Sequence, residues 1–275
     1  MSFLTAALLG LVQGITEFLP ISSSGHLALL QNIFHIEEAD MFFDVLLHLG
    51  TLLAVILAYR RDIAGVIQGG LGLVGVGPDR GKTTQKNADR RRLALFLILG
   101  SLPLLLALPL QKWAETAFTS ATLVSLMLLV SGTILYFSDR FSNGYQGLRD
   151  ASAWEALLVG IAQAIAVIPG ISRSGTTISA GMLCGFKRSF AVQFSFLLCI
   201  PGVLGAGIVS LIGAFRTGID LSLLPKYLCG MVVAAISGYF SIRLIRYLAA
   251  RSNFGVFAYY CWGAGLIALV LSLIA

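Results

Sequence analysis

Charged residues are scarce in this chain: they make up only 12% of its 275 residues, while apolar residues make up 57%. Water-soluble domains carry about a quarter charged residues, so this composition excludes an ordinary soluble globular protein. Several windows of about 20 residues are almost free of charge, which is the length that a helix needs to cross a bilayer. The composition therefore predicts an all-α polytopic membrane protein.

Early basic residues and clustered cysteines are also missing. No Lys or Arg precedes Arg60, so we expect no cleaved signal peptide, since such a signal starts with a basic region. The cysteines stand singly in apolar segments, which favours neither a disulfide framework nor a metal cluster; they are Cys184, Cys199, Cys229 and Cys261.

The positive charge is concentrated in one segment. Of the 19 Lys and Arg residues, 8 lie in residues 60–92, so the net charge of +6 indicates membrane orientation and not nucleic-acid binding. We expect this segment to be a hydrophilic, partly mobile loop with a Gly-rich middle. The positive-inside rule places it on the cytoplasmic side.

The sequence repeats itself. A shift of 150 residues superimposes two polar stretches, EFLPISSSGH from Glu17 and VIPGISRSGT from Val167. Gly10, Gln13, Ile15, Ile21, Ser22, Ser24 and Gly25 fall on Gly160, Gln163, Ile165, Ile171, Ser172, Ser174 and Gly175. A shift of 151 aligns FDVLLHLGTLLA from Phe43 with FSFLLCIPGVLGA from Phe194. We infer a duplicated unit in a single membrane domain, with repeats at about 1–111 and 153–247.

Hydropathy and charge predict the topology. Six full spans are expected, at about 42–59, 93–111, 118–138, 189–213, 226–247 and 254–275. Residues 1–34 and 153–186 each have two apolar arms around a Pro/Gly/Ser break, and neither arm is long enough to span. Each is expected to be a re-entrant helix hairpin. With residues 60–92 inside, the first hairpin opens outward and the second inward, so the repeats are inverted and their breaks meet near the midplane.

The breaks carry the candidate chemistry. Serines and a glycine at a helix start present free N–H groups and a positive dipole end, which suit a phosphate, and Arg173 adds a guanidinium fork. The alternative for the serines is ordinary helix capping, but an arginine in an apolar segment usually marks a function. The candidate phosphate-binding residues are Ser22, Ser24, Gly25, Ser172, Ser174, Gly175 and Thr177.

Four residues are candidates for catalysis: Glu17, Ser23, His26 and Arg173. Glu17 could hold a divalent cation against a phosphate or accept a proton from a nucleophile; the alternative is a salt bridge to Arg173 that joins the repeats. His26, in the first turn of a helix, is expected to be neutral and to act either as a base or as a packing residue.

Three further polar residues could support these groups. Gln13 lies one turn before Glu17 on the same helix face. Asp44 and His48 share one face of the span 42–59. They either orient the catalytic groups or form a hydrogen-bonded seam between helices.

Two stretches resemble the paired motifs of a known family. QGITEFLPISSSGH (from Gln13) and PGISRSGTT (from Pro169) are similar to those of undecaprenyl-diphosphatase, the bacterial bacitracin-resistance membrane phosphatase, and the likeness covers essentially the whole chain. The family's first motif has Glu or Gln, three residues, then Glu; this chain takes the Gln form at Gln13. A metal at Glu17 would therefore need other ligands.

The resemblance implies six spans, two re-entrant hairpins and hydrolysis of undecaprenyl diphosphate to the monophosphate and phosphate, with a divalent cation such as Mg²⁺ or Ca²⁺. This reaction recycles the lipid carrier for peptidoglycan synthesis and confers bacitracin resistance. It further implies a multi-pass protein of the bacterial inner membrane, in contact with membrane lipids. We place the site toward the extracytoplasmic side, because the catalytic candidates concentrate in the outward-opening hairpin.

Two alternatives stay open. Ser23 is the preferred nucleophile, giving a phosphoserine after Glu17 or His26 takes its proton, but direct attack by a metal-bound water is a rival. The alternative function is a transporter or flippase of an anionic polyprenyl phosphate, because inverted repeats with broken helices also form carrier sites. The sequence assigns no oligomeric state.

Overall fold

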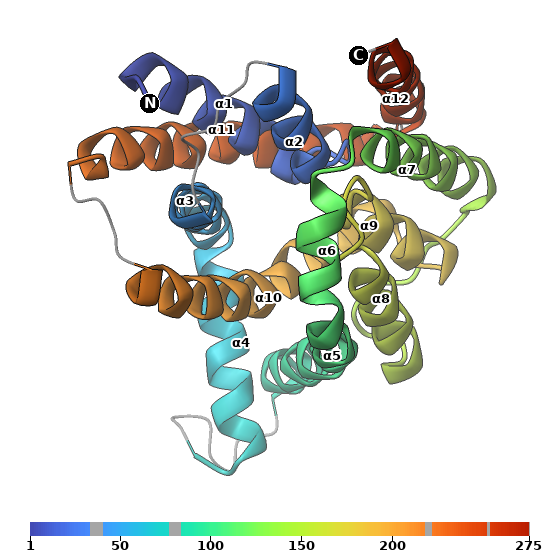
Figure 1. The fold of residues 1–275 in the computed structure, drawn as a ribbon. Helices are drawn as coiled ribbons and strands as arrows, with labels where there is room; N and C mark the ends of the chain where they lie inside the picture. Colours follow the sequence, from blue (N-terminus) through green and yellow to red (C-terminus); the bar gives the residue numbers. More distant parts are fainter. Residues whose placement is uncertain (34–40, 77–83, 218–221, 252–253, 275) are drawn as a thin grey trace.

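The protein is built from α-helices (Figure 1). The computed structural model describes residues 1–33, 41–76, 84–217, 222–251 and 254–274. Within those ranges there is no β-strand, and the one β-type contact is an isolated bridge between Gln146 and Phe186. The predicted all-α class is confirmed.

The helices follow one another with short breaks. In chain order they are α1 (Phe3–Phe18), α2 (Ser23–Ile33), α3 (Met41–Ala58), α4 (Arg60–Leu73), α5 (Gln85–Ala107), the 3-10 turn η1 (Leu108–Leu110), α6 (Gln111–Phe118), α7 (Ala121–Phe141), α8 (Ala153–Ile165), α9 (Arg173–Leu183), α10 (Arg188–Thr217), α11 (Leu224–Ala250) and α12 (Gly255–Ile274).

Several of these helices are long and apolar enough to cross a membrane. Five qualify directly, namely α5 with η1, α7, α10, α11 and α12, and α3 with α4 adds a sixth if that bent pair is one span. Each overlaps one of the six predicted spans. The apolar helices α1 and α8 are shorter, at 16 and 13 residues. The chain is therefore a multi-pass membrane protein.

The predicted loop 60–92 is partly wrong. Helix α4 occupies residues 60–73 and α5 begins at Gln85, while residues 77–83 lie outside the described part of the chain. Gly69, one of the glycines that suggested a mobile segment, instead allows close packing, because a Cβ added there would lie 2.3 Å from the carbonyl oxygen of Arg90. The α4 axis is bent by 86° from that of α3.

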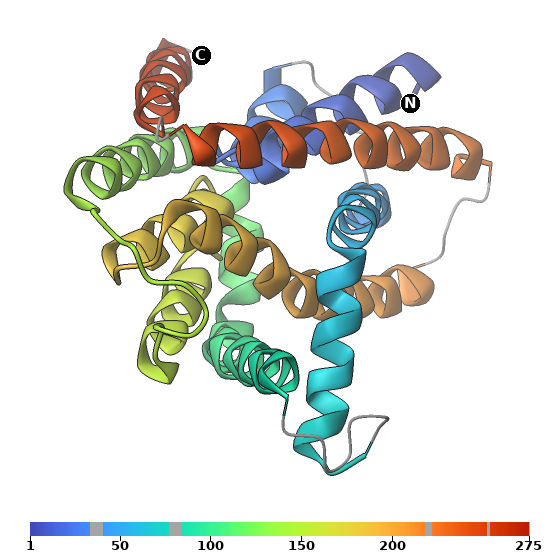
Figure 2. The same ribbon diagram turned by 180° about the vertical axis from the view of Figure 1, so that it is seen from behind.

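Two pairs of helices approach each other in the same way. Helices α1 and α11 run side by side (Figures 1 and 2), and a Cβ at Gly10 would lie 2.3 Å from the Gly230 oxygen. A Cβ at Gly160, on α8, would lie 2.2 Å from the Gly100 oxygen, on α5. Small residues allow such close backbone contact between helices in a membrane. Gly10 and Gly160 are the pair that the shift of 150 superimposes.

An aromatic core supports the end of α1. Phe18, at 1% exposure, packs edge-on against Phe196 of α10 with ring centroids 5.3 Å apart. The ring of Tyr59 also packs edge-on against Phe196, with centroids 6.1 Å apart. These contacts fix the point at which the chain leaves α1 and enters the first polar break.

Replacing Gly160 by Ala tests the close packing. We expect Gly160→Ala to destabilise the folded protein by about 1–3 kcal/mol, because the added methyl overlaps the backbone of α5. Thermal unfolding in detergent measures the effect. Gly205→Ala is the control, since nothing lies within 4 Å of a Cβ at that helical position. Equal melting temperatures for the two variants would contradict the packing described here.

Candidate active site

The two polar breaks have the same design. Helix α1 ends at Phe18 and α2 begins at Ser23, while α8 ends at Ile165 and α9 begins at Arg173. Helices α2 and α9 thus begin within the Ser-rich motifs, at Ser23 and Arg173, and not after the glycines. A residue with positive φ occurs in each break, Ser22 at φ 69° and Gly170 at φ 90°, although the shift of 150 does not superimpose these two positions. A serine in this conformation stores local strain, which is often found at functional sites.

The first serine of each motif caps its helix. The Ser22 hydroxyl accepts the Gly25 N–H at 3.1 Å, and the Ser172 hydroxyl accepts the Gly175 N–H at 3.1 Å. The capping interpretation is therefore correct for these two side chains. Their role in binding phosphate, and that of the two glycines, stays a prediction.

Ser174, the second serine of the motif in the break between α8 and α9, contacts the other break. The Ser174 hydroxyl donates to the carbonyl oxygen of Leu19, in the other break, at 3.1 Å. The hydroxyls of Ser22 and Ser24 are 3.3 Å apart, and those of Ser172 and Ser174 are 3.4 Å apart. The start of α9 is thus in direct contact with the break that precedes α2.

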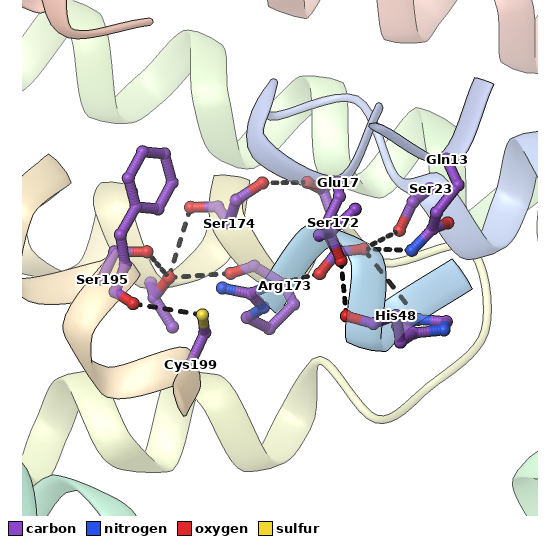
Figure 3. Close-up of polar contacts among 12 residues, drawn as sticks. Gln13, Glu17, Ser23, His48, Ser172, Arg173, Ser174, Ser195 and Cys199 are labelled. Carbon is purple, nitrogen blue, oxygen red and sulfur yellow. Dashed lines mark hydrogen bonds and ion pairs between the residues drawn. The ribbon is translucent and has the colours of Figure 1, made fainter. Parts of the chain in front are cut away.

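An ion pair lies where the breaks meet. Arg173 Nη2 donates to Glu17 Oε1 at 2.5 Å, and the two side chains are 19% and 8% exposed (Figure 3). The salt bridge to Arg173, which the sequence offered as the alternative role of Glu17, is therefore present. Arg173 Nη1 is buried and has no hydrogen-bond partner within the described residues. One edge of the guanidinium therefore keeps an uncompensated donor.

The second carboxylate oxygen of Glu17 collects the other polar groups. The Ser23 hydroxyl donates to Glu17 Oε2 at 2.6 Å, and Gln13 Nε2 donates to the same oxygen at 3.1 Å. Arg173 holds Oε1, so the carboxylate is fixed with Oε2 toward Ser23. This arrangement can take a proton from the Ser23 hydroxyl directly.

His26 does not lie in this cluster of hydrogen bonds. Its Nδ1 contacts the Ser22 carbonyl oxygen at 2.8 Å and its Nε2 contacts the Tyr260 hydroxyl at 2.8 Å. A carbonyl oxygen only accepts, so Nδ1 carries a proton, and in the neutral ring Nε2 accepts from Tyr260. Of the two predicted bases for Ser23, the geometry favours Glu17.

The residues of α3 take different positions. His48 Nε2 lies 4.0 Å from Glu17 Oε2, at the edge of the site. Asp44 Oδ1 instead accepts from Gln31 of α2 at 3.4 Å. Asp44 thus belongs to a seam between helices, whereas His48 faces the carboxylate.

Three neighbours of the site were not predicted. The Thr177 hydroxyl lies 2.6 Å from that of Ser195, and the Cys199 thiol lies beside the Arg173 guanidinium. Tyr260, on α12, stacks on His26 with ring centroids 5.6 Å apart. The shift of 151 superimposes Ser195 on Asp44 and Cys199 on His48. This alignment could therefore have identified Ser195 and Cys199 as neighbours of the site. No sequence signal points to Tyr260.

The side-chain oxygens of Glu17 and Gln13 could supply some of the ligands of a divalent cation. Among the described residues no group of three or more His, Cys, Asp and Glu could hold a metal. However, Gln13 Oε1 is buried and has no partner in the described structure, and it belongs to the amide that contacts Glu17. Carboxylate and amide oxygens are ligands that Mg²⁺ and Ca²⁺ prefer, and Mg²⁺ commonly completes its shell with substrate phosphates and water.

The chain is similar to known proteins along nearly its full length. A family model described as "Bacitracin resistance protein BacA" matches residues 6–267. A protein of Halothermothrix orenii named undecaprenyl-diphosphatase is 38% identical over 96% of both chains. Proteins with the same name from Methanosphaera stadtmanae and Desulfosudis oleivorans are 39% and 40% identical, covering 100% and 95% of this chain and 99% and 95% of their own. This protein, with its paired polar breaks joined by one ion pair, belongs to the BacA family.

Proposed function

We propose that this protein hydrolyses undecaprenyl diphosphate to undecaprenyl phosphate and phosphate, and thereby recycles the lipid carrier for peptidoglycan synthesis and confers bacitracin resistance. The observation that carries the proposal is the cluster of Ser23, Glu17 and Arg173 between two helix starts. Relatives across the full length that bear the name undecaprenyl-diphosphatase support the substrate.

The reaction begins at Ser23. Glu17 Oε2 takes the hydroxyl proton as Ser23 Oγ attacks the terminal phosphorus, and the bond from that phosphorus to the bridging oxygen breaks. Undecaprenyl phosphate leaves with this oxygen. Water then attacks the phosphorus of the phosphoserine, and the bond from Ser23 Oγ to phosphorus breaks. Glu17 returns its proton to Ser23 Oγ, which restores the hydroxyl, and phosphate leaves with the oxygen and protons of the water. The negative charge on the transferring phosphoryl group is stabilised by Arg173 Nη1 and by the N–H groups of the two helix starts. The hydroxyls of Ser24, Ser174 and Thr177 surround these donors.

Glu17 and Gln13 are the groups we assign to a divalent cation, Mg²⁺ or Ca²⁺. The buried, unpartnered Gln13 Oε1 supports this assignment. When bound, such a cation would neutralise charge on the diphosphate. Loss of hydrolysis on chelation, restored by added Mg²⁺ or Ca²⁺, is the expected result; full activity in excess chelator would contradict it.

The breaks between α1 and α2 and between α8 and α9 are proposed to be re-entrant hairpins of two inverted repeats. The twin glycine contacts and twin serine caps support this relation. We place the protein in the bacterial inner membrane with the site toward the extracytoplasmic side. A single cysteine introduced as His26→Cys, in a chain without its native cysteines, should react with an impermeant thiol reagent in intact cells; labelling only in inverted vesicles would reverse the orientation.

A transporter of polyprenyl phosphate is the second candidate. It would use the same meeting of helix ends. A carrier has no need of a hydroxyl held 2.6 Å from a carboxylate oxygen, and this contact favours the enzyme.

Ser23→Ala tests the covalent route. We expect phosphate release from undecaprenyl diphosphate to fall by at least about a thousandfold, because the nucleophile is lost. A trapped phosphoserine in the wild type, found by mass spectrometry after acid quenching, would be the direct sign. Ser101→Ala is the control, since among the described residues that hydroxyl donates only to the Leu97 carbonyl oxygen of its own helix. Full activity in Ser23→Ala would leave water attack as the chemistry.

Tyr260→Phe tests the role of the His26 contact. Losing one neutral hydrogen bond should lower the free energy of unfolding by about 0.5–1.5 kcal/mol, measured by thermal unfolding in detergent, and the same change in a His26→Gln background should have no further effect. Tyr259→Phe is the control, because Tyr259 contacts Tyr136 and Trp262 instead. Equal losses from Tyr260→Phe with and without His26 would show that Tyr260 does not act through His26.

A further inference from the structure

A second polar site lies at the corner between α4 and α5, in the lower part of Figure 1. A cavity of about 390 Å³ is bounded by the end of α4, the first turns of α5 and the connection before α8. Arg91, Arg92 and Arg149 line it, with Asp89 as the one acidic residue among the described residues of its lining. These residues belong to neither polar break, so the cavity is separate from the proposed active site.

The three arginines differ in the hydrogen bonds and ion pairs that they make within the protein. Arg149 holds Asp89 through Nε and Nη2, at 2.8 to 3.2 Å. Arg92 donates to the Ala151 carbonyl oxygen and lies over the Phe96 ring, 5.3 Å from its centroid. Arg91 makes no hydrogen bond or ion pair to any residue that the structure describes. One aspartate against three arginines leaves an excess of positive charge and several free N–H donors, which attract an anion.

The surroundings of the cavity combine charged and exposed apolar side chains, as at the level of lipid headgroups. Helix α5 changes from polar to apolar at Leu93, directly after the arginines. Leu73 and Leu95, which also line the cavity, are 44% and 40% exposed. Ile67 of α4 and Val74, directly after it, are 59% and 72% exposed. With α4 bent 86° away from α3, Leu73 and Leu95 lie next to the charged side chains of the cavity.

We infer that this cavity binds a phosphate group, carried by an anionic membrane lipid. The guanidinium groups of Arg91, Arg92 and Arg149 hold the phosphate oxygens, and the acyl chains lie along Leu73, Leu95 and the exposed face of α4. Basic pockets at the headgroup level between transmembrane helices bind acidic lipids by this combination. A free phosphate ion would use the same arginines but would gain nothing from the apolar side chains.

Binding to purified protein in detergent tests the inference. Native mass spectrometry with phosphatidylglycerol and phosphatidylcholine measures the preference, and thermal unfolding with each lipid reports stabilisation. The wild type should prefer phosphatidylglycerol and be stabilised by it. Arg91→Gln should weaken this preference by about fivefold, the effect expected of one arginine near a membrane surface. Because Arg91 has no partner among the described residues, its replacement should leave the fold intact.

The controls separate the possible sources of phosphate. Arg61→Gln, which removes an exposed arginine of α4 outside the cavity, should keep the wild-type preference. If Arg61→Gln and Arg91→Gln lose the preference equally, only general surface charge acts and the inference is wrong. If inorganic phosphate stabilises the wild type as much as phosphatidylglycerol does, the cavity binds the free ion and the lipid is excluded. Hydrolysis of undecaprenyl diphosphate in phosphatidylcholine should be equal in both variants, which separates this site from the catalytic one.

Discussion

The ion pair between Glu17 and Arg173 joins two parts of the chain that are 156 residues apart. Both side chains are mostly buried, and removing one partner of a buried pair costs about 3–5 kcal/mol, because the other charge is left uncompensated. Glu17 is at the end of α1 and Arg173 at the start of α9, so the pair forms only when the two breaks meet. The glycine contacts of α1 with α11 and of α8 with α5 hold the helices in that position.

The same pair prepares the site for chemistry. With Oε1 held by Arg173, the carboxylate of Glu17 presents Oε2 to the Ser23 hydroxyl and to the Gln13 amide. The guanidinium in turn keeps a buried Nη1 without a partner among the described residues. A substrate phosphate that accepts from Nη1 would satisfy a donor that the protein leaves unpaired. Fixed donors of this kind stabilise developing charge without reorganisation during the reaction.

The sequence predicted the two polar breaks, because the repeat makes their motifs visible. The meeting of Glu17 with Arg173 followed from two similar motifs in apolar surroundings, and the spans followed from hydropathy. Helix α4 was missed because Gly-rich sequence was interpreted as mobile, whereas Gly69 is needed for contact with α5. The Tyr260 contact was missed because α12 carries no copy of either motif. A self-alignment cannot show which side chain of such a helix lies against His26.

A structure of the protein with a nonhydrolysable methylene analogue of undecaprenyl diphosphate would test the central claim most directly. We expect the terminal phosphonate to contact Arg173 Nη1, with Ser23 Oγ about 3–3.5 Å from its phosphorus and in line with the bridging carbon. The pair between Glu17 and Arg173 should remain in place. An analogue bound away from both helix starts, or one whose phosphonates contact neither Arg173 nor Ser23, would contradict the account.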